Sequence, residues 1–193
     1  MNVVIINYNA GNVQSVKNTL VRLGIEPELS ADEEQIRKAD KVIFPGVGEA
    51  STAMEFLRQR KLDEVIKSLK QPVFGVCLGL QLMCTYSEEN DTECLGIFDV
   101  QVKKFEPKLK VPQMGWNTLE KMNSALFNDL PEDPYVYYVH SYYAELSRYT
   151  VAQTEYINSF SAALQKNNFY ALQAHPEKSG KVGEKILENF LQL

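Results

Sequence analysis

The residues that could do chemistry cluster around a cysteine. Residues 72–81 read PVFGVCLGLQ, an apolar segment that ends on Cys77, with Gly75 and Gly79 two positions to either side. A side chain can be pushed out of a sharp strand-to-helix turn only when its neighbours lack colliding Cβ atoms. A thiol at the start of a helix also gains from unpaired backbone N–H groups, which favour the thiolate. The spacing predicts a nucleophile, although taken alone it also fits a small buried thiol.

A second group stands near the C-terminal end. Residues 169–179 read FYALQAHPEKS, a strand-like apolar run that reaches His175, with Glu177 two positions later. Residues i and i+2 of an extended segment point the same way, so the carboxylate can hold the imidazole while its other nitrogen faces a thiol. The chain has 2 histidines, and only His175 has an acid at this spacing. We therefore expect a triad of Cys77, His175 and Glu177, with His140 in a structural role.

These segments resemble the class I (triad) glutamine amidotransferases, whose cysteine attacks the side-chain carbonyl of glutamine and releases ammonia. Within this family the chain is similar to the glutaminase subunits of imidazole glycerol phosphate synthases. That similarity rests on YNAGN at 8–12, PGVG at 45–48, PQMGWN at 112–117, YVHSY at 138–142 and HPEKS at 175–179, which together span most of the chain. The chain departs from the family pattern at Asn7 and Asn9, where Asp and Gly are usual, and at Gln113, where His is usual.

The resemblance implies a division of roles at the site. Cys77 attacks the carboxamide carbon, His175 protonates the leaving ammonia and then activates a water, and Glu177 orients the ring. Charge that develops on oxygen needs backbone donors in place before the reaction, and the candidates are the amides of Leu78 and Val47. The turn that contains Val47 also fits an ordinary strand ending. The expected contacts to glutamine are Gly48, Gln81, Glu89, Ser141 and Tyr142, with Glu89 alternatively a solvated charge.

A partner is also expected, because ammonia released into water is lost to a synthase. The resemblance implies a cyclase partner, folded as a (β/α)8 barrel, that uses ammonia to make imidazole glycerol phosphate and aminoimidazole carboxamide ribonucleotide in histidine biosynthesis. The two chains would form a heterodimer, with Met114, Trp116, Asn117 and Lys178 at the docking face. The alternatives are a paralogous cyclase in another pathway, such as amidino-sugar synthesis, and a non-catalytic module that keeps the fold. The intact triad argues against the last of these.

The elements that position these residues follow an α/β rhythm. Strands are expected at 3–8, 41–44 and 73–76. Helices are expected at 13–23, at 50–60, in a further segment that ends at residue 70, and at 78–86. This alternation predicts a mostly parallel, doubly wound, flavodoxin-like sheet that binds ligands beyond its carboxyl edge. From residue 97 the pattern turns β-rich, at 98–105, 135–143, 150–155, 161–165 and 169–173, which suggests appended antiparallel hairpins. A closing helix starts at about residue 178.

The composition agrees with a cytoplasmic enzyme. At 193 residues and 45% hydrophobic, the chain suits a single domain over 1–193. The apolar runs are too short for a membrane span, and no signal-peptide pattern is present. The 3 cysteines show no Cys-x-x-Cys pair, which argues against disulfides and a zinc site, and we expect no metal or cofactor. A net charge of −5 gives no footprint for nucleic acid.

Overall fold

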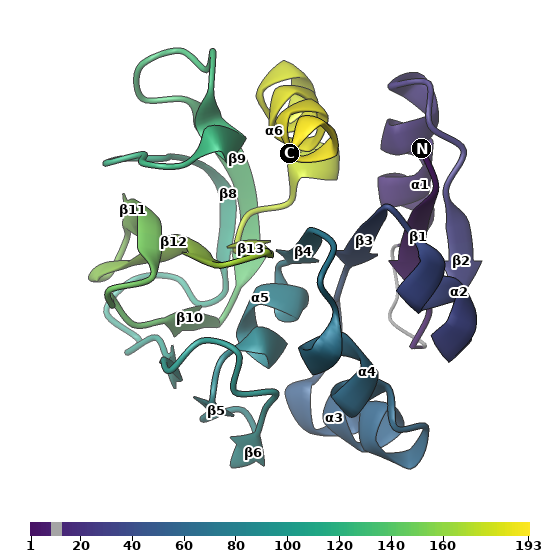
Figure 1. The fold of residues 1–193 in the computed structure, drawn as a ribbon. Helices are drawn as coiled ribbons and strands as arrows, with labels where there is room; N and C mark the ends of the chain where they lie inside the picture. The colour runs from purple at the N-terminus through teal and green to yellow at the C-terminus, as the bar shows by residue number, and fades with distance from the viewer. Residues whose placement is uncertain (9–12) are drawn as a thin grey trace.

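A seven-stranded sheet forms the centre of the computed structural model, in the order β11-β12-β13-β4-β3-β1-β2 (Figure 1). The structure describes residues 1–8 and 13–193, so Asn9 and the rest of 9–12 lie outside the described residues. The parallel strands are β13 (Phe169–Leu172), β4 (Val73–Val76), β3 (Lys41–Phe44), β1 (Val3–Ile6) and β2 (Glu28–Ser30). The strands β12 (Ser159–Lys166) and β11 (Thr150–Glu155) extend the sheet in antiparallel fashion.

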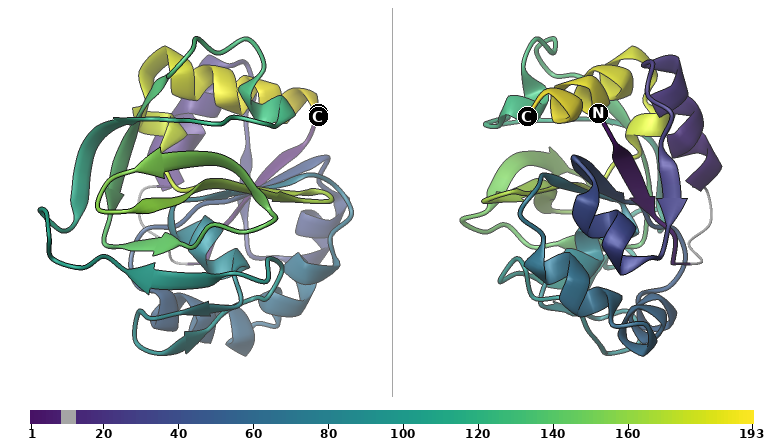
Figure 2. Two further views of the ribbon diagram at one scale, coloured as in Figure 1. Left: turned by 90° about the vertical axis from the view of Figure 1, so that its left-hand side faces the viewer. Right: turned by 45° about the vertical axis from the view of Figure 1, so that its right-hand side comes forward.

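Helices cover both faces of this sheet (Figures 1 and 2). One face holds α1 (Val13–Arg22) and α6 (Gly180–Gln192), and the other holds α2 (Glu33–Lys38), α3 (Ala50–Gln59), α4 (Leu62–Ser68) and α5 (Leu78–Met83). In β1, Val3 and Ile5 join the core under α1 and α6, whereas Val4 and Ile6 join the opposite core. Strands covered on both faces have no polar side, which explains the uninterrupted apolar runs in the sequence.

Two smaller sheets stand beside the parallel core. The first contains β10 (Tyr142–Ala144), β7 (Gln101–Lys104), β5 (Tyr86–Ser87) and β6 (Thr92–Glu93), in that order. The second is the outer ribbon, formed by β8 (Gln113–Thr118) and β9 (Tyr135–His140). Short 3-10 helices lie at η1 (Ala125–Phe127) and η2 (Pro176–Lys178). Across the described ranges, no helix combines the length and apolar character needed to cross a membrane.

The predicted fold class is confirmed, and the differences lie at individual elements. The expected helix 78–86 ends at Met83, because Cys84 turns extended and the chain enters β5. The expected strand 135–143 breaks at Ser141, so β9 and β10 belong to different sheets. The strands β2, β5, β6 and β8 and the helix α2 were not predicted. A capping signal marked α2, since the Asp32 side chain accepts a hydrogen bond from the Gln35 amide.

Candidate active site

Three adjacent parallel strands bring the predicted site together. Cys77 follows β4, His175 comes three residues after the end of β13, and the turn 45–48 follows β3. In the sheet β13 pairs with β4, and β4 pairs with β3. The carboxyl ends of neighbouring parallel strands lie side by side, so three segments far apart in the sequence meet at one edge.

Cys77 stands on a strained turn between β4 and α5. Its backbone has φ 53° and ψ −108°, a conformation that an L-residue holds only at a cost of about 1–3 kcal/mol. Both flanking glycines lie so close to neighbouring atoms that a side chain would collide with them. A Cβ atom on Gly79 would overlap the carbonyl oxygen of Phe44, and one on Gly75 would lie 2.9 Å from the sulfur of Met83. The turn therefore packs directly on β3 and on its own helix.

His175 and Glu177 meet in a buried ion pair. The Nδ1 atom of His175 lies 2.8 Å from a carboxylate oxygen of Glu177, and both side chains are 1% exposed. The sequence predicted this contact from an extended segment, but Glu177 lies in the 3-10 turn η2. The backbone amide of His175 donates to the carbonyl of Tyr137, and the Ser179 hydroxyl donates to the carbonyl of His175. These bonds attach the turn to the outer ribbon and to the start of α6.

The electrostatics of His175 couple it to the nucleophile. Burial lowers the pKa of this imidazole, but the Cys77 sulfur and the Glu177 carboxylate outweigh burial and raise it to about 10. Within the described part of the chain, the Nε2 atom is buried and makes no hydrogen bond of normal geometry. Hydrogen bonds between catalytic groups are often long before substrate binds. The protonated imidazole therefore places a positive charge beside the sulfur.

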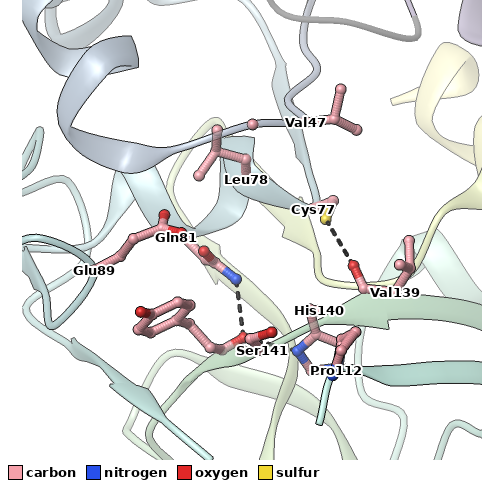
Figure 3. A pocket seen from close by; sticks show the side chains of 11 residues that line it. Val47, Cys77, Leu78, Gln81, Glu89, Pro112, Val139, His140 and Ser141 are labelled. Carbon is pink, nitrogen blue, oxygen red and sulfur yellow. Dashed lines mark hydrogen bonds between the residues drawn. The ribbon is translucent and has the colours of Figure 1, made fainter.

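The cavity in front of Cys77 contains every predicted glutamine contact. It measures about 360 Å³, a size suited to a small molecule. It is lined by Val47, Gly48, Cys77, Leu78, Gln81, Glu89, Pro112, Val139, His140, Ser141 and Tyr142 (Figure 3). Glu89 is half-buried and accepts a hydrogen bond of 2.8 Å from the Ala50 amide at the start of α3. Burial is also the main reason that the pKa of Glu89 is raised.

The two predicted oxyanion donors are not both free. The Leu78 amide donates to the carbonyl of Gly46 at 3.2 Å, so the turn 45–48 occupies it. Val47 lines the cavity, with its side chain pointing away from the Cys77 sulfur (Figure 3). The hydroxyl of Tyr8 donates to the carbonyl of Pro45, and Gly48 has φ +119°, which favours glycine. The turn is thus held by two contacts in a conformation that blocks one donor.

Two residues near the sulfur were not predicted from the sequence. The Gln173 Nε2 atom lies 3.6 Å from the Cys77 sulfur, and the Val139 carbonyl lies 4.0 Å from it (Figure 3 shows the second contact). A signal existed for Gln173, because a polar residue inside the apolar run FYALQA needs a buried partner.

Gln113, one of the departures from the family pattern, faces inward. It is 4% exposed, and its side chain lies 3.0 Å from the Nε2 atom of His140. The other ring nitrogen of His140 contacts the carbonyl of Tyr142 at 2.7 Å. Burial lowers the pKa of His140 to about 4, so the ring is neutral at pH 7. Gln113 therefore supports the wall of the cavity and does not reach the outer surface.

The predicted docking residues lie on the outer ribbon, except Lys178, which lies in η2. Met114 is 58% exposed and Trp116 is 55% exposed, although a lone tryptophan is more often a core residue. The Trp116 ring packs edge-on against Tyr137 with centroids 5.9 Å apart, and the Lys178 ammonium lies 5.9 Å from the same Tyr137 ring. The Asn117 side chain instead makes an intramolecular hydrogen bond, in which it donates to the carbonyl of Glu155.

Comparison with known proteins agrees with this geometry. Residues 4–193 match the family model of class-I glutamine amidotransferases. The imidazole glycerol phosphate synthase subunit HisH of Bacteroides thetaiotaomicron is 58% identical over 100% of both chains. The protein of the same name from Escherichia coli K12 is 44% identical, again over 100% of both chains.

Solved structures show the same fold at low sequence identity. A crystal structure of a glutamine amidotransferase superposes with a TM-score of 0.78 and 18% identity, over 99% of this chain and 98% of that one. A glutamine amidotransferase from Thermotoga maritima gives a TM-score of 0.66 and 16% identity, over 100% and 83%. From its family match and its full-length relatives, the chain belongs to the class-I glutamine amidotransferases and, within them, to the HisH subunits of imidazole glycerol phosphate synthase.

Proposed function

We propose that this chain is a glutaminase that hydrolyses glutamine to glutamate and ammonia for a cyclase subunit in histidine biosynthesis. The observation that carries the proposal is the meeting of Cys77, His175 and Glu177 at one sheet edge, with the thiol open to a small cavity. The family membership selects glutamine as the substrate whose carboxamide enters that cavity. Residues 1–193 act as one domain, since both cores share the central sheet.

The first half-reaction forms a thioester. The Cys77 thiolate attacks the carboxamide carbon, and a sulfur–carbon bond forms while charge moves onto the oxygen. The protonated Nε2 of His175 then gives its proton to the nitrogen, and the carbon–nitrogen bond breaks to release ammonia. Glu177 accepts the hydrogen bond from Nδ1, so the ring keeps the orientation in which Nε2 faces the sulfur.

The second half-reaction returns the enzyme to its starting state. Neutral His175 removes a proton from water, and the resulting hydroxide attacks the thioester carbon. Glutamate leaves, the thiolate is regenerated, and His175 is protonated again. Overall, glutamine plus water gives glutamate, ammonia and the proton that the new carboxyl group releases.

Glutamine must be recognised by its α-ammonium and α-carboxylate groups, because its side chain is consumed. Glu89 supplies a negative charge for the ammonium at the far side of the cavity from Cys77. Both hydrogens of the Gln81 amide are used, by the carbonyl of Tyr142 and by Gln173, so its oxygen is the atom left for the ammonium. The Ser141 hydroxyl lines the same cavity and serves the carboxylate.

The outer ribbon is the proposed docking face for the cyclase, in a cytoplasmic heterodimer. Its exposed side chains Met114, Trp116 and Tyr135 form what we call the docking patch. Large aromatic side chains of this kind anchor interfaces. The relatives are named as subunits, which supports a second chain, and the (β/α)8 barrel of that chain is part of the proposal. Gln113, which is buried against His140, gives no reason to prefer a paralogous cyclase.

Glutaminase activity measured with and without the cognate cyclase tests this function. We expect glutamate release that depends on Cys77, and ammonia-dependent cyclase activity that becomes glutamine-dependent only when this chain is added. If the histidine-pathway cyclase fails to couple while a paralogous cyclase couples, the pathway assignment is wrong and the glutaminase assignment stands. If Cys77→Ala keeps the glutaminase activity, the triad itself is wrong.

A further inference from the structure

A buried carboxamide lies beside the nucleophile, outside the triad. Gln173 follows β13 directly and is 0% exposed. One of its amide atoms lies 3.6 Å from the sulfur of Cys77, and the other lies 3.0 Å from the side-chain nitrogen of Gln81. Burying a carboxamide costs free energy unless its polar atoms are bound, so both contacts matter to the fold and to the site.

The hydrogen-bonding partners decide which amide atom faces the sulfur. The carbonyl of Tyr142 can only accept, so the Gln81 atom 2.9 Å away from it is the NH2 group. The second hydrogen of that NH2 group points to Gln173, and the facing atom of Gln173 is therefore its oxygen. The NH2 group of Gln173 is left pointing at Cys77. The carbonyl of Tyr142 thus fixes the amide orientation of Gln81, which in turn fixes that of Gln173.

We infer that Gln173 is a further catalytic residue, which donates a side-chain N–H to the Cys77 thiolate and is held in that orientation by Gln81. The inference rests on the proposed function only in taking Cys77 as the nucleophile. A hydrogen bond to an ionised acceptor is stronger than one to a neutral acceptor, and burial strengthens it further. The donor therefore favours the thiolate over the thiol.

Titratable groups also surround the sulfur: His175 and Tyr8 interact with it, whereas Glu177 and His140 interact with His175. His175 and Glu177 lie after β13, His140 lies on β9, and Tyr8 follows β1. Burial raises the pKa of Tyr8, and the Cys77 sulfur raises it further, while its hydroxyl donates to Pro45. A carboxamide does not titrate, so the Gln173 donor acts equally at every pH. Its effect can therefore be separated from the protonation of His175.

Such a donor has two opposing consequences for reactivity. It lets the thiolate form at lower pH, and it also makes that thiolate a weaker nucleophile. Loss of one hydrogen bond to a charged group corresponds to a shift of about 1 pH unit. With a Brønsted coefficient of about 0.4–0.5, the fully ionised sulfur then reacts about threefold faster. The rate at which Cys77 reacts rises with pH as the thiol ionises, and this profile has a midpoint. Removing the donor should slow the reaction of Cys77 at pH values below that midpoint and accelerate it at pH values above it.

Alkylation of Cys77 by iodoacetamide across a pH series tests this on the full-length chain. The sulfur–carbon bond forms as iodide leaves, and mass spectrometry of the Cys77 peptide gives the rate. We expect Gln173→Met to move the midpoint up by about 1 pH unit, so that its profile crosses that of the parent. The same change on the neighbouring strand, Gln165→Met, is the matched control and should leave the profile in place.

A second variant guards against a folding defect. Gln173→Glu keeps the shape and the oxygen that Gln81 needs, but it places an acceptor where the N–H stood, and it should move the midpoint up by more than Gln173→Met does. Unchanged midpoints in folded samples of both variants would overturn the inference and leave Gln173 a packing residue. Alkylation needs no turnover, so this outcome is distinct from a failure of the glutaminase assignment, which Cys77→Ala reports.

Discussion

Catalytic side chains are buried at the catalytic edge, where β3, β4 and β13 end, and large apolar side chains are exposed on the outer ribbon. At the edge, His175 and Glu177 are 1% exposed, and Gly79 packs against the carbonyl of Phe44. On the ribbon, Met114 and Trp116 are more than half exposed. Burial holds charged and nucleophilic groups in one geometry, whereas exposure keeps apolar surface available to a second chain. The difference agrees with the proposal that the chemistry takes place at the edge and that a partner binds to the ribbon.

The two regions nevertheless share a strand. In β9, Tyr137 accepts a hydrogen bond from the backbone of His175 and also packs against Trp116. Val139, two residues on, places its carbonyl 4.0 Å from the sulfur. A partner that shifts the ribbon would therefore act on both the base and the nucleophile.

The largest effect is expected at the nucleophile. Cys77→Ala should lower the glutaminase rate by at least about 10⁴-fold, because no other group can form the thioester. Cyclase activity driven by ammonium salts should be unchanged, since the ribbon is intact. Cys84→Ala and Cys94→Ala are controls, and both should stay close to the parental rate, because burial raises the pKa of each of these thiols. A comparable loss of the glutaminase rate in either control would contradict the assignment of Cys77 as the nucleophile.

The second effect distinguishes the base from the residue that orients it. His175→Ala should leave almost no activity, whereas Glu177→Gln should retain about 10–100 times more, because an orienting acid contributes less than the base it holds. Steady-state kcat with saturating glutamine measures this. Equal losses in the two variants would contradict the assigned roles.

The ribbon should show the reverse pattern. Trp116→Ala should weaken binding of the cyclase by about 10–100-fold, since a central aromatic anchor is removed. Glutaminase activity of the isolated chain should stay within about twofold, because the ring does not line the cavity. Calorimetric titration with the cyclase gives the Kd, and Val21→Ala, an exposed apolar residue on α1, is the control. An unchanged Kd would place the interface elsewhere.

The link between the regions can be tested at the turn 45–48. If the turn must reorient to free the Leu78 amide, the isolated chain is a poor glutaminase, and the cyclase with its nucleotide raises kcat more than it lowers KM. Tyr8→Phe removes the hydroxyl that holds Pro45, and it should raise basal kcat by about 3–10-fold while reducing the stimulation. A chain that is fully active alone would instead indicate a preformed oxyanion hole.

The smallest effect concerns pH and stability. The folded pKa of His175 is raised to about 10, above the usual value of about 6.5, so the native state binds the extra proton. This stabilisation is fully present below about pH 6.5 and is lost as pH rises toward 10. Urea unfolding at pH 6 and pH 10 should show a fall of about 1–2 kcal/mol more in the parent than in Cys77→Ala, which lacks the sulfur. Equal falls in the free energy of unfolding of the two proteins would contradict the coupling between His175 and the Cys77 sulfur.

Much of the site could be predicted because its signals are local. The glycines around Cys77 and the acid two residues after His175 are visible in short segments, and so is the βα alternation that places strand ends together. Even so, the reason given for the His175–Glu177 contact was wrong, since a 3-10 turn and not an extended segment joins them. The outer strand β8 was missed because its exposed residues carry no buried alternation.

The sequence by itself determined the strained turn at Cys77, the pairing of His175 with Glu177 and the parallel core. Only the tertiary structure decided that Gln173 reaches the sulfur, that the Leu78 amide is occupied by Gly46, and that Gln113 turns inward to His140. Those contacts join residues from different strands and turns. They depend on how the sheet orders its strands and how the ribbon folds over its edge, and no short segment carries that information.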